Sequence, residues 1–460
     1  MSVRALLASA LLAAGSMAQL TGSVGPLTTS AQKAAVKVCN ILDYGGVASV
    51  DTDNGAAITA AWSACASGGQ VYIPAGDYGL ATWVSLKHGT GVSINIEGTI
   101  HRTGTGGGNM IFIQLSTDLE IYSATSTGAI QALGYEFHKN GEYGARILRL
   151  YKTSNFSIHD IALVDSPQFH LTLDTCTSGE VYNTVIHGGY EGGLDGIDVS
   201  GSNIWIHDVE VSNKDECVTV KNPSSNLLIE SVHCNWSGGC GMGSLPTGTN
   251  IHDIEYRNIY THHSNNMYMI KSNGGDGTVY NLALNNFIGH TNAYMLLMDT
   301  AWSKQAVGSG NGVVYHDISV NEWHGTAQNG VQRAPVRLLC PALAPCYDVN
   351  ITNFSVSSEA ASKELYICQN AYGEGACLKE LEAGATSATA SYAATTHPRT
   401  VASPAFATMA NELASGFDIS SPIPIPTIPA SFFPGIAPKP SAFGSWSGRW
   451  NTGFKGKKAE

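Results

Sequence analysis

Ile206-His207-Asp208-Val209 is one copy of a short repeat that decides the fold of this chain. The repeat places a polar residue and then Asp, Asn or Ser between apolar positions. Its copies between about Ile147 and Val356 are Ser157-Ile158-His159-Asp160-Ile161, Ile206-His207-Asp208-Val209, Ile229-Glu230-Ser231-Val232, Ile251-His252-Asp253-Ile254, Val279-Tyr280-Asn281-Leu282 and Tyr315-His316-Asp317-Ile318. Asp208 lies 23 residues before Ser231 and 45 residues, or two units, before Asp253. A period of this length is typical of solenoids, which stack one structural unit on the next.

A second series of short apolar segments follows the same period. Its members are Phe169–Leu173, Gly196–Val199, Cys217–Val220, Met267–Ile270 and Tyr294–Leu297. Each unit therefore contains at least two strands, and a single unit cannot bury its own apolar face. We predict an all-β chain folded as a right-handed, single-stranded parallel β-helix. The alternative, a β-sandwich, would need hairpin turns such as Asn-Gly between its strands, whereas the turns here are longer.

We predict residues 1–18 to be a secretory signal peptide. Arg4 precedes the apolar run from Ala5 to Ala14, and Ser16-Met17-Ala18 has the small-x-small pattern of a cleavage site. The run is too short to span a bilayer, so we expect a secreted, extracellular protein without a membrane partner. The alternative is a buried N-terminal helix.

Residues 19–380 are expected to form the catalytic β-helix. Asn54 and the following Gly55–Trp62 have the pattern of a capped amphipathic helix, which would cover the open end of the solenoid core. Gln70–Tyr78 then begins the first strand. Residues 381–460 change to Ala, Ser and Thr and then to spaced Pro, which predicts an extended tail without a catalytic share.

The overall charge argues against a nucleic-acid partner. The chain has 460 residues with a formal net charge of −12, and only 13% of its residues are charged, whereas Gly occupies 51 positions. We expect a monomer that uses neither a cofactor nor a metal ion. A polyanionic substrate would have to be held by a few local cations.

The ten cysteines fit an oxidising compartment. Four pairs are close in sequence or bracket one unit: Cys39 with Cys65, Cys217 with Cys234, Cys340 with Cys346, and Cys368 with Cys377. Cys176 and Cys240 remain, as possible buried thiols. Sequons for N-glycosylation occur at Asn155, Asn235, Asn350 and Asn353, the last two too close for both to be used.

Acidic residues are scarce, so their clustering is informative. Asp195, in Gly193-Leu194-Asp195-Gly196, stands one coil before Asp215 and Glu216. Adjacent parallel strands lie about 4.8 Å apart, which would bring the three carboxylates together at one sheet edge. Their mutual repulsion would keep at least one protonated and so supply an acid and a base at the same pH. A calcium site or a solvated rim is the alternative.

The stretch from Asp195 to Lys271 resembles the glycoside hydrolases of family 28, the polygalacturonases and rhamnogalacturonases. The family carries Asn-Thr-Asp-Gly, Asp-Asp-Cys, Gly-His-Gly and Arg-Ile-Lys in this order. The chain has Gly193-Leu194-Asp195-Gly196, Asp215-Glu216-Cys217, Gly239-Cys240-Gly241 and Met269-Ile270-Lys271. Ile41-Leu42-Asp43-Tyr44-Gly45 also looks like the opening of that fold, so the similarity covers roughly residues 39–360.

The resemblance implies an inverting hydrolase in which Asp215 is the general acid and Asp195 and Glu216 activate water. The implied acid has a raised pKa and lies about 6.5–9.5 Å from the base. Met269 replaces the Arg that, with the Lys, holds uronate carboxylates in polygalacturonases, whereas Lys271 is kept. One of the two sugars at the cut would then be uncharged. This favours endo-cleavage of α-1,2 galacturonate–rhamnose linkages in the rhamnogalacturonan I backbone of pectin.

Three alternatives remain open at this point: a polygalacturonase acting on homogalacturonan, a calcium-dependent β-helix lyase and a non-catalytic carbohydrate-binding solenoid. The chain has no Arg among its clustered acids, which disfavours the lyase, and fold alone cannot exclude the binding protein.

Cys240 stands where the family has a His, and we expect His290 to replace that side chain near the carboxylates. The alternative is a turn histidine, and His170 is a weaker candidate for the same role. Tyr294 and Trp236 could stack on sugar rings.

Overall fold

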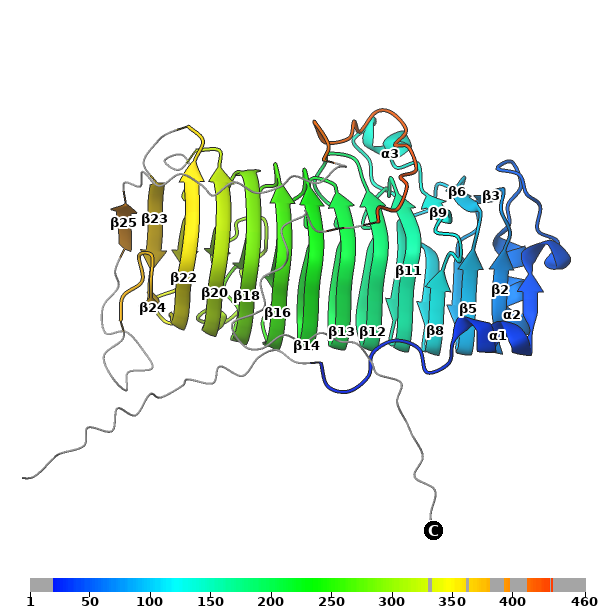
Figure 1. Ribbon diagram of the computed structural model, residues 1–460, viewed down its shortest axis with the longest axis horizontal. Helices are drawn as coiled ribbons and strands as arrows, with labels where there is room; N and C mark the ends of the chain where they lie inside the picture. The colour runs from blue at the N-terminus through cyan, green and yellow to red at the C-terminus, as the bar shows by residue number, and fades with distance from the viewer. Residues whose placement is uncertain are drawn as a thin grey trace, which may run out of the picture.

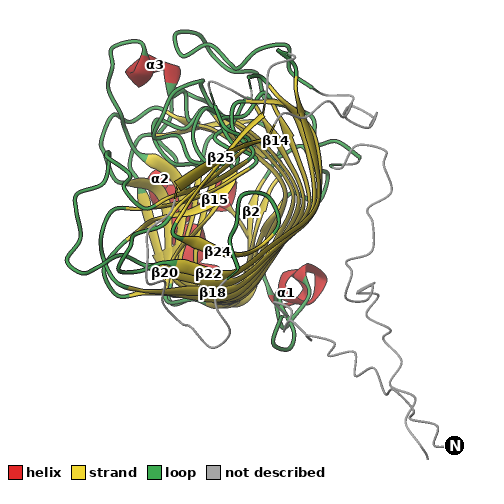
Figure 2. Ribbon diagram, turned by 90° about the vertical axis from the view of Figure 1, so that its left-hand side faces the viewer, coloured by secondary structure: helices red, strands yellow, loops and turns green. Residues whose placement is uncertain are grey.

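The computed structural model describes residues 20–329, 333–360, 364–380, 393–397, 412–430 and 432, and of 393–397 only the backbone. Its strands lie side by side as the rungs of one long stack (Figure 1). Neighbouring rungs pair in parallel, except for the antiparallel pair β23–β25 at one end. Viewed along the stack, the strands of successive coils superpose (Figure 2). The structure therefore confirms the predicted parallel β-helix.

The long strands that form the curved wall of the solenoid are β11 (Ser154–Val164), β12 (Leu171–His187), β13 (Ile197–Ser212), β14 (Val218–Asn235), β16 (Thr249–His262), β18 (Gly277–Asn292), β20 (Val314–Ala327) and β22 (Cys346–Ser358). The shorter strands of the N-terminal coils are β1 (Val38–Asn40), β2 (Ser67–Ile73), β3 (Asp77–Leu80), β4 (Val84–Lys87), β5 (Thr90–Ile96), β6 (Thr99–Arg102), β7 (Asn109–Gln114), β8 (Thr117–Tyr122), β9 (Ala129–Gln131) and β10 (Arg146–Tyr151). Those of the later coils are β15 (Cys240–Leu245), β17 (Tyr268–Ser272), β19 (Leu296–Asp299), β21 (Val336–Leu339), β23 (Glu364–Gln369), β24 (Ala371–Glu374) and β25 (Ala393–His397). The helices are α1 (Ser30–Val36), the 3₁₀ turn η1 (Ile41–Tyr44), α2 (Gly55–Cys65) and α3 (Tyr135–His138).

The recurring polar residue of the sequence repeat bends each long strand. Its left-handed backbone has φ between 50° and 57° at Asp160, Asp208, Ser231, Asp253, Asn281 and Asp317. Asp and Asn tolerate this conformation better than most residues, because their short polar side chains bond locally. The preceding His bonds the Asp carboxylate in several copies, as between His207 and Asp208 at 2.7 Å. The repeat therefore encodes the bend that lets one strand serve two walls of the solenoid.

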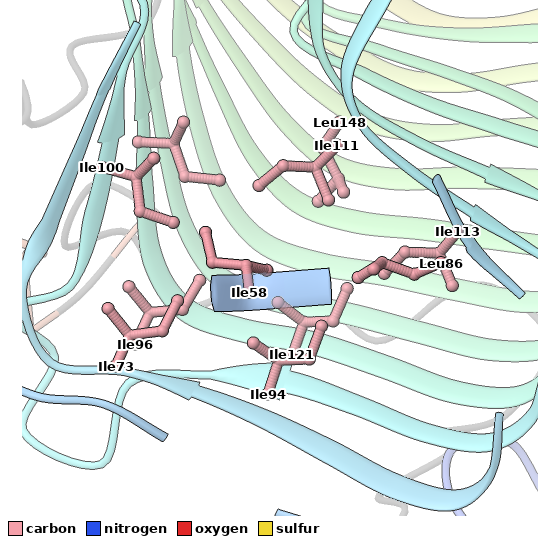
Figure 3. Close-up of a pocket in the computed structure, with 11 residues that line it drawn as sticks. Ile58, Ile73, Leu86, Ile94, Ile96, Ile100, Ile111, Ile113, Ile121 and Leu148 are labelled. Carbon is pink, nitrogen blue, oxygen red and sulfur yellow. The ribbon is translucent and has the colours of Figure 1, made fainter. Parts of the chain in front are cut away.

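Helix α2 covers the N-terminal end of the core, as predicted. Its residue Ile58 points into a cavity of about 10 Å³, which is lined by Ile and Leu side chains of the first coils (Figure 3). A space of this size holds at most about one water molecule, and an apolar lining offers that water no partners. The cavity is thus a packing defect under the cap and not a ligand site. Helix α1, which the sequence did not predict, lies outside the strand wall (Figure 2). Its residue Lys33 pairs with Asp118 at 3.1 Å.

Part of the predicted C-terminal tail lies against the solenoid. Trp236 donates its indole N–H to the Leu413 carbonyl at 2.8 Å, and Gln131 bonds the Ile423 carbonyl at 2.8 Å. Ile423 packs with Ala162 and Val164 in a small apolar cluster. The segment 412–430 is therefore a strap over the coil edges. The predicted signal peptide lies outside the described residues, as do residues 381–392, 398–411 and 433–460 of the tail.

The structure contains the four disulfide bonds expected from the spacing of the cysteines, and it leaves Cys176 and Cys240 as buried thiols. Of the four sequons, Asn350 and Asn353 are exposed and Asn155 is half-buried. The prediction for Asn235 is wrong, because this residue is fully buried at the end of β14 and offers no room for a glycan. No helix in the described ranges is long and apolar enough to cross a bilayer.

Candidate active site

The three carboxylates of Asp195, Asp215 and Glu216 gather at one sheet edge. Asp195 precedes β13 and Glu216 precedes β14, and the Gly196 N–H bonds the Glu216 carbonyl at 2.9 Å, which holds the two coils in register. Each residue presents a carboxylate oxygen within 4.8 Å of the other two. The prediction that these residues lie together on neighbouring rungs is confirmed.

Backbone donors and a cation hold the cluster in place. Asp215 accepts hydrogen bonds from the Gly193 N–H and from the Glu216 N–H, the latter at 3.0 Å. Gly193 has φ 79°, which glycine adopts without strain, so its N–H can turn toward Asp215. Lys271 donates to the Glu216 carboxylate and also lies 5.5 Å from the centre of the Trp302 ring.

Sequence reasoning missed two further charged residues in the cluster, Asp198 and Lys221. The Lys221 ammonium lies 3.0 Å from Asp198 and 3.4 Å from Asp195, and it donates to the Gly243 carbonyl at 2.8 Å. Both residues alternate with inward-facing core positions on β13 and β14, a pattern that could have revealed them. Four carboxyl groups thus face two ammonium groups, so the full set of carboxylates is not neutralised.

The protonation of the cluster differs from the prediction. Burial and the neighbouring Asp198 raise the pKa of Asp195 to about 8, and burial with Asp195 and Asp215 raises the pKa of Glu216 well above its usual range. Burial alone would also raise the pKa of Asp215. Hydrogen bonds from Glu216 and the Gly193 N–H, with the Lys271 ammonium, nevertheless hold it below its usual value. The expectation of a raised pKa at Asp215 is therefore wrong for the substrate-free protein.

The separation of the three carboxyl groups stays a prediction. One oxygen of each carboxylate lies within 4.8 Å of an oxygen of the other two, and this distance is shorter than the separation between whole carboxyl groups. The inverting range of about 6.5–9.5 Å refers to whole carboxyl groups. The stereochemistry of cleavage is therefore read from the product.

The prediction that His290 joins the carboxylates is wrong. In the strand register, His290 of β18 lies opposite His262 of β16, and His262 lies opposite Asn235, the last residue of β14. His290 therefore stands two rungs, or about 10 Å, beyond β14. There it gathers with His262 and Glu412, whose donor atoms all lie within 4.8 Å of one another, as in sites that can hold a metal ion. The prediction failed because His290 lies within the long strand β18 and not in the loop that follows this strand.

His170 lies behind the cluster. Its ring nitrogen bonds the Asp195 carbonyl at 3.1 Å, and its complete burial lowers its pKa to about 4. A neutral, buried ring of this kind supports the loop that carries Asp195. Cys240, which replaces the family His, points into the core 3.7 Å from the Cys234 sulfur, and burial raises the pKa of its thiol to about 12. Neither residue can exchange protons with a sugar at the surface.

The predicted substrate-binding residues lie on the outer face of the sheet or in its loops. On β17, Tyr268 and Ile270 enter the core, whereas Met269 and Lys271 alternate with them on the outer side of the sheet, where both are still buried. Tyr294 precedes β19, with the Arg333 guanidinium 5.5 Å from its ring centre. Trp236 instead stacks on His263 and bonds the C-terminal strap, so it does not present a free ring.

The arrangement favours acid–base chemistry over a calcium site. Lys271 and Lys221 contact the oxygens of Glu216, Asp195 and Asp198 that a calcium ion would need. An ammonium group within 3.4 Å of these oxygens opposes binding of a second cation by direct repulsion. The same ammonium groups suit carboxyl groups that exchange a proton, because they stabilise whichever one is ionised.

Comparison with known proteins agrees with this chemistry. A family model described as glycosyl hydrolases family 28 matches residues 65–377. Rhamnogalacturonase A of Aspergillus aculeatus is 55% identical over 433 residues, which cover 93% of this chain and 98% of that protein. Probable rhamnogalacturonase B of Aspergillus terreus is 54% identical over 433 residues, with 94% of this chain and 81% of that protein covered.

Solved structures share the fold at lower identity. Endo-xylogalacturonan hydrolase from Aspergillus tubingensis superposes with a TM-score of 0.67 at 22% identity, over 76% of this chain and 100% of that one. The polygalacturonase from Erwinia carotovora gives a TM-score of 0.54 at 17% identity, over 74% and 96%. With the family model spanning most of the solenoid and relatives more than half identical over nearly the whole chain, this protein belongs to the glycosyl hydrolases of family 28.

Proposed function

We propose that this hydrolase cuts galacturonate–rhamnose linkages within the backbone of rhamnogalacturonan. The observation that carries the proposal is the outer face of β17, where Lys271 reaches the carboxylate cluster while its neighbour Met269 offers no charge. A single cation on the outer face of β17 suits one charged and one uncharged sugar, as in an alternating polymer. The rhamnogalacturonases that are 54–55% identical to the chain support the same substrate.

Asp195, Asp215 and Glu216 are the catalytic residues of this proposal. In the substrate-free protein the raised pKa values place the shared proton on Asp195 or Glu216, and Asp215 is the ionised member. Glu216 lies within hydrogen-bonding reach of Asp215, so the proton can pass between them when a sugar enters. Asp215 then protonates the leaving oxygen, and Glu216, now ionised and held by Lys271, takes a proton from a water that Asp195 helps to hold.

The enzyme is expected to act outside the cell as a monomer on pectic polysaccharide. Four disulfide bonds support an oxidising compartment, because such bonds persist mainly in secreted proteins. The test of the substrate is a separate digestion of homogalacturonan and rhamnogalacturonan, with identification of the new reducing end. We expect galacturonate at the reducing ends from rhamnogalacturonan and little product from homogalacturonan. Equal rates on both polymers would refute the specificity drawn from Met269.

A further inference from the structure

Three successive rungs beyond the carboxylates carry a row of side chains on the outer side of the sheet, of which two are buried and the third, Arg337, is partly exposed. In the parallel register, Met269 of β17 is followed by Leu297 of β19 and then by Arg337 of β21. The flanking residues of each strand, such as Tyr268 and Leu296, enter the core, so this row faces outward. The row therefore changes from apolar to cationic as it leaves the site.

Arg337 is placed to bind an anion on this surface. Its nearest carboxylate is Asp299 at 3.6 Å, which is an ion pair too long for a direct hydrogen bond. One third of its side chain is exposed. A guanidinium carries five N–H donors in a fork that matches a carboxylate, so a bound uronate could form the two short bonds that Asp299 does not.

Aromatic side chains stand at the two ends of β19. Tyr294 precedes the strand, and Trp302 follows it, joined to the Ser272 carbonyl through its backbone N–H at 2.9 Å. Each ring has a cation near its face, Arg333 at Tyr294 and Lys271 at Trp302, both at 5.5 Å. Aromatic rings at a sheet edge are typical of surfaces that bind sugars, whose C–H faces pack on aromatic groups.

The spacing of the cations matches an alternating polymer. Lys271 and Arg337 stand two rungs apart, about 10 Å along the solenoid axis. A pyranose unit is about as long as one rung, so two rungs correspond to one uronate–deoxysugar repeat. Leu297, on the rung between the cations, and Met269 are apolar and buried, so the rung between the two cations offers no charge to a bound sugar.

We propose that Arg337 forms a second uronate-binding subsite, one repeating unit farther from the cut than Lys271. This inference rests on the proposed function and deepens it. The subsite adds affinity only for chains long enough to reach β21, and it selects polymers in which the carboxylates recur every second sugar.

The experiment compares rhamnogalacturonan oligosaccharides that differ by one repeating unit. For the wild type, kcat/KM should be higher for the oligosaccharide whose added uronate reaches Arg337. Arg337→Gln should lower kcat/KM on that longer oligosaccharide by about ten- to a hundredfold, as expected for the loss of a charge-assisted hydrogen bond. Activity on the shorter oligosaccharide should be unchanged. Asp299→Asn is the matched control, because it removes the competing carboxylate but keeps Arg337, so the rise should stay or increase.

A second measurement keeps the proposal testable if Arg337→Gln does not fold. Reduction of the uronates of the longer substrate to neutral sugars at that position should lower kcat/KM of the wild type by the same factor. A loss that is equal at all chain lengths, or no loss at all, would overturn the subsite. If the wild type cuts no rhamnogalacturonan oligosaccharide, the proposed function is refuted, and the subsite that rests on it is refuted as well.

Discussion

Lys271 donates its ammonium group to the Glu216 carboxylate from two rungs away. The rung between them carries Gly243, where an added Cβ would lie 3.0 Å from the Lys271 Cγ atom. Because Gly243 has no side chain, the Lys271 side chain can pass over this rung toward Glu216. A single contact thus joins the residue expected to bind a uronate to a residue expected to activate water, and this coupling can be tested.

Substitution of Lys271 by Met should weaken transition-state binding by about 2–3 kcal/mol, the usual size for a charge-assisted hydrogen bond. The variant loses both the uronate contact and the cation that stabilises ionised Glu216. The measurement is kcat/KM on rhamnogalacturonan. Lys139→Met, which removes an exposed lysine after α3, is the control and should behave as the wild type. An unchanged kcat/KM in Lys271→Met would remove this lysine from the site.

The two buried charges that flank Asp195 should shift the alkaline limit of activity in opposite directions. Asp198 raises the pKa of Asp195, and Lys221 lowers it. Asp198→Asn should therefore move the loss of kcat/KM to lower pH, and Lys221→Met should move it to higher pH, each by about one unit. A pH–rate profile of both variants measures this. If both variants shifted the alkaline loss of kcat/KM in the same direction, that loss would not reflect the ionisation of Asp195.

The contribution of Asp195 to stability should fall as the pH rises from about 4 to about 8. In this window the folded protein keeps a proton on Asp195, whose pKa is raised from 3.8 to about 8, whereas the unfolded chain has lost it. The unfolded state then binds fewer protons, so each pH unit lowers the free energy of unfolding by up to about 1.4 kcal/mol.

Asp195→Asn removes this dependence, because the amide has no proton to lose. Thermal unfolding across the window should show that the stability of the variant, relative to that of the wild type, rises with pH. Identical slopes would place the raised pKa elsewhere in the cluster, with Glu216 as the next residue to test.

The sequence predicted the parts of this molecule that repeat. Asp208 and its counterparts recur because each coil needs the same left-handed bend, and Asp195 and Glu216 align because they precede equivalent strands. His290 was misplaced because motif spacing does not say where a strand ends and a loop begins. The C-terminal strap leaves no periodic signal, since it binds through backbone carbonyls such as that of Leu413. The low pKa of Asp215 depends on a hydrogen bond with Glu216 and on the Gly193 backbone N–H, and no side-chain pattern reveals the latter.

The last prediction concerns Asp215 and the stereochemistry of cleavage. Asp215→Asn should remove nearly all turnover, because the amide cannot deliver a proton to the leaving oxygen, while binding of the polysaccharide and the melting temperature stay near those of the wild type. We expect inversion, since Glu216 and Asp195 act on a water and Lys271 keeps Glu216 from acting as the nucleophile. Proton NMR of the first-formed product decides it. A β reducing end from an α linkage supports a single displacement by water, whereas a first-formed α product would require a covalent intermediate and a different role for Glu216.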